Sequence, residues 1–135
     1  TPPLFIQRNI ATGLKNLEML ACINNNRGIE DIRHVMEQVG LDRDDKRTYR
    51  KYSLGMKQKL GIAAAYMENP DIIILDEPIN ALDEAGAKQV HEILEEQKKR
   101  GALIIIACHD KEELEMLSDE IIEIYEGRIV AGEKE

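Results

Sequence analysis

The chain has 135 residues, enough for one ordinary domain with a buried core. Its formal net charge of -8 at pH 7 argues against nucleic acid as a partner, because binding nucleic acid needs a basic face. No apolar run approaches the roughly 20 residues needed to cross a bilayer, so we expect any membrane role to come through a partner.

The first half of the chain is predicted to be helical. Apolar residues recur at helical spacing in three segments, residues 12–23, 29–39 and 54–68. Thr12 can cap the first helix, Gly40 is a stop signal after the second, and Pro70 follows the third. Residues 24–28 form a turn by composition, and residues 41–52 are charged and irregular.

The second half alternates strands and helices. Strands are predicted over residues 72–76, 102–108, 121–125 and 128–131, and helices over residues 84–100 and 111–117. The apolar run before Asp76 suits a central strand covered on both faces, and the run ending at Cys108 suits a second buried strand. Such alternation is typical of a parallel α/β layer, which divides the chain into a helical part, residues 1–69, and an α/β part, residues 70–135.

Two further features have ordinary explanations. Cys22 and Cys108 have no zinc-like spacing and lie in apolar segments, which predicts core thiols in a reducing cytosol. A basic stretch between Arg43 and Lys59 is either a solvated loop and helix face or an anion-attracting surface beside a phosphate site.

The most informative residues are two adjacent acids, Asp76 and Glu77, which follow an apolar strand and precede Pro78. Buried acids cost free energy unless a cation or hydrogen bonds offset them. Open parallel sheets bind their ligands at the carboxyl ends of the strands. The pair therefore suits one metal ion and one water molecule, although the run alone also fits a plain strand end and turn.

Three other groups could carry chemistry. Ser53 and Gly55 lie at the start of a predicted helix, where exposed amides and the helix dipole favour an anion such as phosphate, or where Ser53 is simply an N-cap. The run from Asn80 to Asp83 starts the long helix, which Asp83 can cap. His109 leaves the same sheet edge as the acid pair, where it could reach a phosphate or serve only a structural role.

In this order, the pieces resemble the ATP-binding-cassette (ABC) transporter ATPases. The resemblance assigns the signature motif to Ser53, Leu54, Gly55 and Met56, the Walker B strand to residues 72–76, the catalytic glutamate to Glu77, the D-loop to Asn80 through Asp83, and the switch histidine to His109. It implies a P-loop NTPase-like (RecA-like) α/β parallel sheet, here incomplete. Residues 1–69 would be the helical subdomain, and residues 70–135 the C-terminal half of the core.

The resemblance also implies roles. Asp76 would hold Mg²⁺, Glu77 would polarise the attacking water, and His109 would steady the γ-phosphate of ATP. The signature residues would contact ATP bound to a second cassette in a head-to-tail dimer, with Asp83 at the seam.

Two departures from the family pattern bear most on the site. Leu54 stands where glycine is commoner and Met56 where glutamine is, which keeps the backbone amides but removes one polar side chain. The phosphate-binding run G-x-x-x-x-G-K-[ST] does not occur in the 135 residues. We therefore expect a C-terminal portion of a cassette that hydrolyses little or no ATP by itself.

The expected whole protein is the ATPase subunit of a bacterial exporter, similar to exporters of peptide antibiotics. It would work with a transmembrane permease subunit at the cytoplasmic face of the cell membrane. Two alternatives are a soluble ABC ATPase without a transport role and a non-catalytic module that supplies the signature motif in trans.

Overall fold

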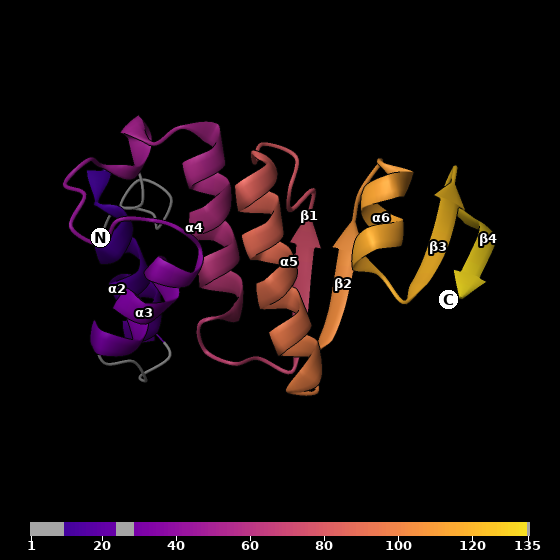
Figure 1. The fold of residues 1–135 in the computed structure, drawn as a ribbon, viewed down its shortest axis with the longest axis horizontal. Helices are drawn as coiled ribbons and strands as arrows, with labels where there is room; N and C mark the ends of the chain where they lie inside the picture. Colours follow the sequence, from indigo (N-terminus) through magenta and orange to yellow (C-terminus); the bar gives the residue numbers. More distant parts are fainter. Residues whose placement is uncertain (1–9, 24–28, 135) are drawn as a thin grey trace.

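The computed structural model describes residues 10–23 and 29–134. Its elements follow one another along the long axis of the molecule in nearly sequence order, from helices at one end to two strands at the other (Figure 1). The turn predicted over residues 24–28 lies outside the described residues.

The predicted helices of the first half are confirmed to within two residues at each end. They are α2 (Gly13–Ile23), α3 (Ile29–Gln38) and α4 (Leu54–Tyr66), with a short 3-10 helix, η1 (Tyr49–Lys51), before α4. The Thr12 hydroxyl accepts a hydrogen bond of 3.2 Å from the Lys15 amide, as its capping role requires. Gly40, which ends the α3 segment, has a φ of 78°, a left-handed conformation that glycine adopts without strain.

A two-stranded parallel sheet lies beside these helices. Strand β1 (Ile72–Asp76) pairs with β2 (Leu103–Ala107), and α5 (Glu84–Lys99) connects them. The register places Ile72 opposite Leu103 and Asp76 opposite Ala107. Both strands therefore end at the same edge of the sheet.

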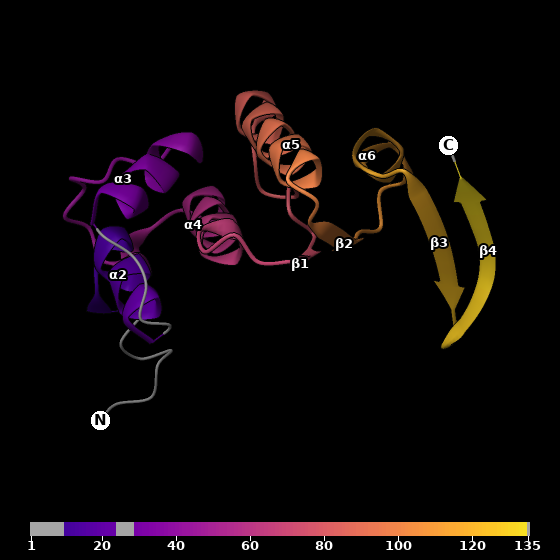
Figure 2. The same cartoon turned by 90° about the horizontal axis from the view of Figure 1, so that it is seen from below.

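The prediction that both strands are covered on both faces is wrong for the described chain. Ile73 and Leu75 are buried, whereas Ile72 and Ile74 are 56% and 69% exposed. Leu103 and Ile105 of β2 are likewise 57% and 48% exposed. Figure 2 shows α5 lying over one face of the pair, and no described element covers the other face.

The chain ends in the helix and hairpin that the sequence predicted, except that the last strand runs three residues beyond its predicted end at residue 131. Helix α6 (Lys111–Leu117) precedes β3 (Glu120–Tyr125), which pairs antiparallel with β4 (Arg128–Lys134). The two-residue turn between the strands has positive φ at both Glu126 (49°) and Gly127 (77°), as a type I′ hairpin turn requires.

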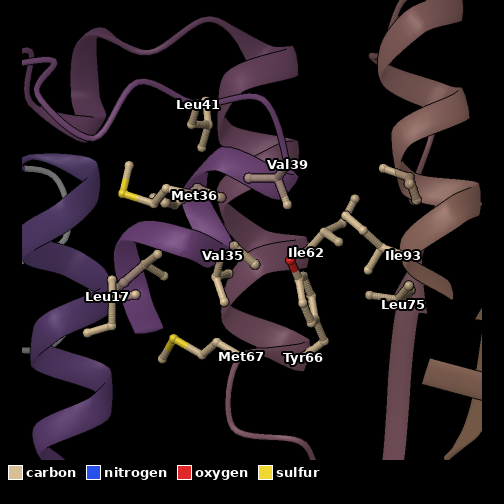
Figure 3. Packing of buried hydrophobic residues seen from close by; sticks show 14 of the residues in the cluster. Leu17, Val35, Met36, Val39, Leu41, Ile62, Tyr66, Met67, Leu75 and Ile93 are labelled. Atoms are coloured by element: carbon tan, nitrogen blue, oxygen red, sulfur yellow. The ribbon is translucent and has the colours of Figure 1, made fainter. Parts of the chain in front are cut away.

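Helix α4 lies at the centre of the buried core. Figure 3 shows Ile62 and Tyr66 of α4 between Val35 of α3 on one side and Leu75 and Ile93 of the α/β part on the other. Burial of each large apolar side chain contributes about 1.5–3 kcal/mol to stability. Because one cluster of buried side chains runs through both parts of the chain, the boundary between residues 69 and 70 stays a prediction.

The cysteines are not core residues. Cys22 is exposed at the end of α2 and Cys108 is only partly buried, so the prediction of two core thiols is wrong. Cys22 follows the buried Ala21, but its own side chain faces outward. Within the described part of the chain, no helix is long and apolar enough to cross a membrane.

Candidate functional site

The acid pair lies where β1 ends. The Glu77 amide donates a 2.8 Å hydrogen bond to the carbonyl of Ala107, so the pairing with β2 extends one residue beyond the strand. Glu77 itself has a φ of 48°, which is uncommon for a residue with a side chain. Pro78 and Ile79 are buried directly after it and anchor the turn. The Glu77 carboxylate is therefore held at the sheet edge by a fixed backbone, whereas Asp76 is exposed.

His109 lies next to Glu77, as the sequence predicted from their positions after neighbouring strands. Its backbone amide donates a 3.1 Å hydrogen bond to Oε1 of Glu77. Its Nε2 atom lies 3.7 Å from the same oxygen, and the imidazole side chain is fully exposed, at 101%. The ring is thus free to approach a ligand while the backbone of His109 orients the carboxylate.

An open cavity of about 490 Å³ lies at this edge. It is lined by Asp76, Glu77, Asn80, His109, Asp110 and Glu113. Four of these six residues are acids, so the cavity favours cations. Carboxylate and amide oxygens are the ligands that Mg²⁺ prefers, so Asp76, Glu77 and Asn80 fit a magnesium ion by their chemistry.

Three residues of the site were not predicted. Cys108 donates a 3.2 Å hydrogen bond from its thiol to Oε2 of Glu113. Burial is the main cause that raises the pKa of Cys108 to about 11. The Asp110 carboxylate caps α6 by accepting hydrogen bonds from the amides of Glu112 (2.9 Å) and Glu113 (3.3 Å). The sequence could have indicated these residues by their position soon after β2, because they follow the same sheet edge that was assigned to His109.

Cys108 also belongs to a group of candidate metal ligands. One ligand atom each from Glu77, Cys108 and Glu113 lies within 4.8 Å of the others. The group does not include Asp76, the residue expected to hold Mg²⁺, and a thiol is a poor magnesium ligand.

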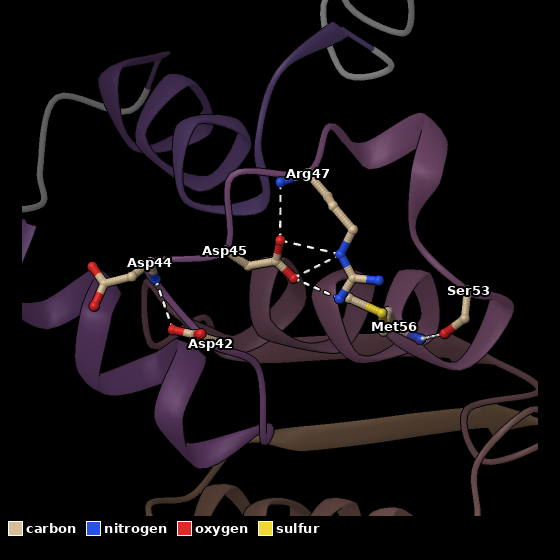
Figure 4. A network of polar contacts seen from close by, with 6 residues as sticks. All are labelled: Asp42, Asp44, Asp45, Arg47, Ser53 and Met56. Atoms are coloured by element: carbon tan, nitrogen blue, oxygen red, sulfur yellow. Dashed lines mark hydrogen bonds and ion pairs between the residues drawn. The ribbon is translucent and has the colours of Figure 1, made fainter.

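The signature residues lie apart from this cavity, at the start of α4. The Ser53 hydroxyl accepts a 3.1 Å hydrogen bond from the Met56 amide, so the ordinary N-cap interpretation is confirmed (Figure 4). Ser53 and Leu54 are exposed, and Leu54 is 70% accessible. None of Ser53, Leu54, Gly55 and Met56 lines the cavity, so within one chain the structure does not bring the two groups of predicted residues together.

Helix α4 nevertheless contacts the loop that follows Glu77. The side-chain amide of Gln58 donates a 2.7 Å hydrogen bond to the carbonyl oxygen of Glu77. Gly55 lies so close to the same loop that a Cβ atom there would be 2.9 Å from the carbonyl oxygen of Ala81. Asp83 ends the loop by capping α5, accepting a 2.7 Å hydrogen bond from the Gly86 amide. The contact of Gln58 was not predicted, because nothing local connects the two positions.

The basic stretch is partly neutralised by local acids. Arg47 forms an ion pair of 2.7 Å with Asp45, and the Asp42 carboxylate accepts a hydrogen bond from the Asp44 amide (Figure 4). The hydrogen bonds from Arg47 lower the pKa of Asp45. The Lys57 ammonium lies 5.2 Å from the centre of the Tyr49 ring. For Arg47, the solvated-loop interpretation therefore holds.

Comparison with known proteins gives a consistent result. A family model described as "ABC transporter" matches residues 5–80. The chain is 46% identical over 119 residues to the uncharacterized ABC transporter ATP-binding protein YybJ of Bacillus subtilis, covering 88% of this chain and 55% of that protein. It is 39% identical over 129 residues to the lantibiotic transport ATP-binding protein SrtF of Streptococcus pyogenes (96% and 55%). It is also 39% identical over 120 residues to the bacitracin transport ATP-binding protein BcrA of Enterococcus faecalis (88% and 39%).

Solved structures share the fold. A structure described as the ATP binding subunit of an ABC transporter matches with a TM-score of 0.83 and 27% identity, over 93% of this chain and 54% of that one. The dimeric structure of the bacterial ABC transporter cassette MJ0796 matches with a TM-score of 0.81 and 24% identity, over 93% and 57%. The α/β P-loop NTPase fold expected from the sequence is therefore confirmed. The chain spans about half the length of these relatives, or less.

Proposed function

Since this chain belongs to the ABC transporter family, we propose that it is part of the ATP-hydrolysing subunit of a bacterial exporter. Proteins of this family bind ATP. The observation that carries the proposal is the cavity at the sheet edge, where the carboxylate of Glu77 is oriented by the backbone of His109 beside Asp76. The relatives SrtF and BcrA are named for the transport of a lantibiotic and of bacitracin, which supports amphiphilic peptides as cargo.

In this proposal, each residue of the cavity edge has a separate task. Glu77 accepts a proton from the water that attacks the γ-phosphate, and His109, with its exposed ring, contacts that phosphate. Asp76 would hold Mg²⁺, directly or through water, which would supply positive charge beside the phosphates. The acidic lining supports a bound cation there, because the same carboxylates would otherwise repel a polyphosphate.

The remaining predicted residues face partners. Ser53, Leu54, Gly55 and Met56 would contact ATP held by a second cassette, with Asp83 at the seam of a head-to-tail dimer. Exposure of Ser53 and Leu54 at a helix N-terminus supports this role, since free amides and the helix dipole favour phosphate. Residues 1–69 would form the helical subdomain that meets a transmembrane permease at the cytoplasmic face of the membrane, and residues 70–135 would form part of the catalytic core.

The decisive test is Glu77→Gln in the complete subunit. Because glutamine keeps the size of the side chain but cannot accept the proton of water, we expect kcat for ATP hydrolysis to fall by about 10²-fold or more, with ATP binding retained. Glu115→Gln, an exposed acid on α6 outside the cavity, is the matched control and should leave kcat unchanged. Undiminished turnover in Glu77→Gln would rule out the proposal.

A further inference from the structure

The geometry points to Gln58 as a positioning residue for Glu77: its side-chain amide fixes the backbone from which the proposed catalytic carboxylate projects. This inference rests on the proposed function, which gives Glu77 its chemical role. Gln58 touches neither ATP nor water in this scheme and acts only through Glu77.

The hydrogen bond itself is short and partly buried. Gln58 Nε2 lies 2.7 Å from the carbonyl oxygen of Glu77. The other donor to that oxygen, the Asn80 amide, is 3.4 Å away, near the limit for a hydrogen bond. The orientation of the Glu77 peptide group is therefore determined mainly by a side chain from α4.

Glu77 needs such a support because its backbone is in a disfavoured conformation. Its φ of 48° lies in the left-handed region, which residues with a Cβ rarely adopt unless their surroundings hold them there. Two other contacts come from the β2 side, through the carbonyl of Ala107 (2.8 Å) and the amide of His109 (3.1 Å). Gln58 completes the set from the opposite side. Without it, the peptide can relax and the carboxylate can leave the His109 amide.

A second observation ties α4 to the same loop. A Cβ at Gly55 would lie 2.9 Å from the Ala81 carbonyl oxygen, so the backbone of α4 approaches the loop as closely as glycine permits. Ser53 begins this helix. One contact therefore joins two proposed functional groups. One is the end of α4, which would meet a partner's ATP, and the other is Glu77, which would act on the chain's own ATP.

The test is Gln58→Met in the complete subunit, since methionine has a similar length and volume but no N–H donor. We expect kcat for ATP hydrolysis to fall about 10-fold or more and KM for ATP to stay within about twofold, because the water-activating group is misplaced and the phosphate contacts remain. Gln38→Met is the matched control. It removes a comparable part-buried hydrogen bond, 2.9 Å from the Tyr66 hydroxyl to Gln38 Oε1, and should leave kcat unchanged.

A second variant tests whether the donated hydrogen bond itself is needed, beside the split between kcat and KM that a merely structural role would not produce. In Gln58→Glu, the new carboxylate cannot donate a hydrogen bond at neutral pH, but its protonated form can. The ratio of its kcat to that of the wild type should therefore rise as the pH falls toward 5. This kcat ratio of Gln58→Glu to the wild type still tests the inference if Gln58→Met does not fold.

The outcomes separate the two proposals. If Glu77→Gln abolishes turnover while Gln58→Met keeps kcat, or while Gln58→Glu shows no acid rescue, the inference about Gln58 is wrong and the proposed function stands. An equal loss of kcat in Gln38→Met would also overturn it, since general loosening would then explain the effect. If Glu77→Gln leaves turnover intact, the proposed function fails first.

Discussion

At the scale of single residues, Cys22 and Cys108 offer an internal comparison. Burial raises the pKa of Cys108 to about 11 from its ordinary value of 9.0, whereas Cys22 is exposed. At pH 8 the thiolate fraction of Cys108 is therefore about 100-fold below that of an ordinary thiol. We expect iodoacetamide to modify Cys22 first and Cys108 only slowly, as followed by peptide mass spectrometry.

The raised pKa of Cys108 also determines how the stability of the folded chain and the alkylation rate change with pH. The pKa of Cys108 is raised only in the folded state. The stability that this thiol contributes is therefore fully present below pH 9 and is lost as the pH rises through about 11. Alkylation of Cys108 should accelerate over the same range in a Cys22→Ser background. Equal rates for both cysteines at pH 8 would contradict the prediction.

The residues of the site were predictable to different degrees, for a physical reason. Asp76, Glu77 and His109 follow apolar strands, and parallel strands end at one edge, so the sequence pattern places them together. The contact between Gln58 and Glu77, and the left-handed backbone of Glu77, depend on how α4 docks against the sheet. No short-range pattern carries that information. The roles of all these residues stay predictions.

At the scale of elements, the start of α2 is fixed by a close contact with the segment before α4. Thr12 and Thr48 form an isolated bridge, and the hydroxyl of the buried Tyr52 lies where a Cβ at Gly13 would be. Gly13→Ala should therefore lower the free energy of unfolding by about 1–3 kcal/mol, measured by urea denaturation of the complete subunit.

The matched variant is Tyr52→Phe, which removes the hydroxyl that meets the new methyl group. The double variant Gly13→Ala with Tyr52→Phe should lose less stability than the sum of the two single changes. If the losses of stability in the two single variants simply add in the double variant, the contact between position 13 and the Tyr52 hydroxyl is not the cause of the loss in Gly13→Ala.

The hairpin turn has a glutamate in a backbone conformation that glutamate rarely adopts. Glu126 has a φ of 49°, a region where asparagine is much better tolerated than glutamate. We expect Glu126→Asn to raise the free energy of unfolding by about 0.5 kcal/mol, and Gly127→Ala, at a φ of 77°, to lower it by about 1 kcal/mol. Thermal unfolding of the two variants should therefore move in opposite directions, and a shift in the same direction would count against a type I′ turn.

Most element boundaries were predicted to within two residues because their signals are local, but β4 runs three residues past its predicted end at residue 131. Gly40, Gly101 and Gly127 all have positive φ and stand at the ends that the sequence indicated. Burial of the strands was predicted badly, because it depends on which elements lie over each face. The four exposed aliphatic residues of β1 and β2 look the same in sequence as their buried neighbours.

At the scale of the whole molecule, one face of the β1–β2 sheet has no described element over it, which should make residues 1–135 prone to self-association in isolation. Ile72, Ile74, Leu103 and Ile105 expose a contiguous apolar surface, and such surfaces promote association. Ile74→Lys with Ile105→Lys should reduce self-association in sedimentation experiments without loss of helical circular dichroism.

The control places the same charges on the covered face. Ile73 is buried and Ile104 packs against the core, so Ile73→Lys with Ile104→Lys should unfold the chain. Similar behaviour of the two double variants would mean that the two faces of the sheet do not differ in solution.

The two sheets also differ in the order in which they can assemble during folding. Strands β3 and β4 are joined by two residues, and hairpins of this kind close within about 1–10 μs. Pairing of β1 with β2 must instead wait until the chain has spanned all of α5, which raises the entropic cost of closure. When the complete unfolded chain refolds, we therefore expect the sheet edge that holds Glu77 and His109 to form after the hairpin has begun to open and close.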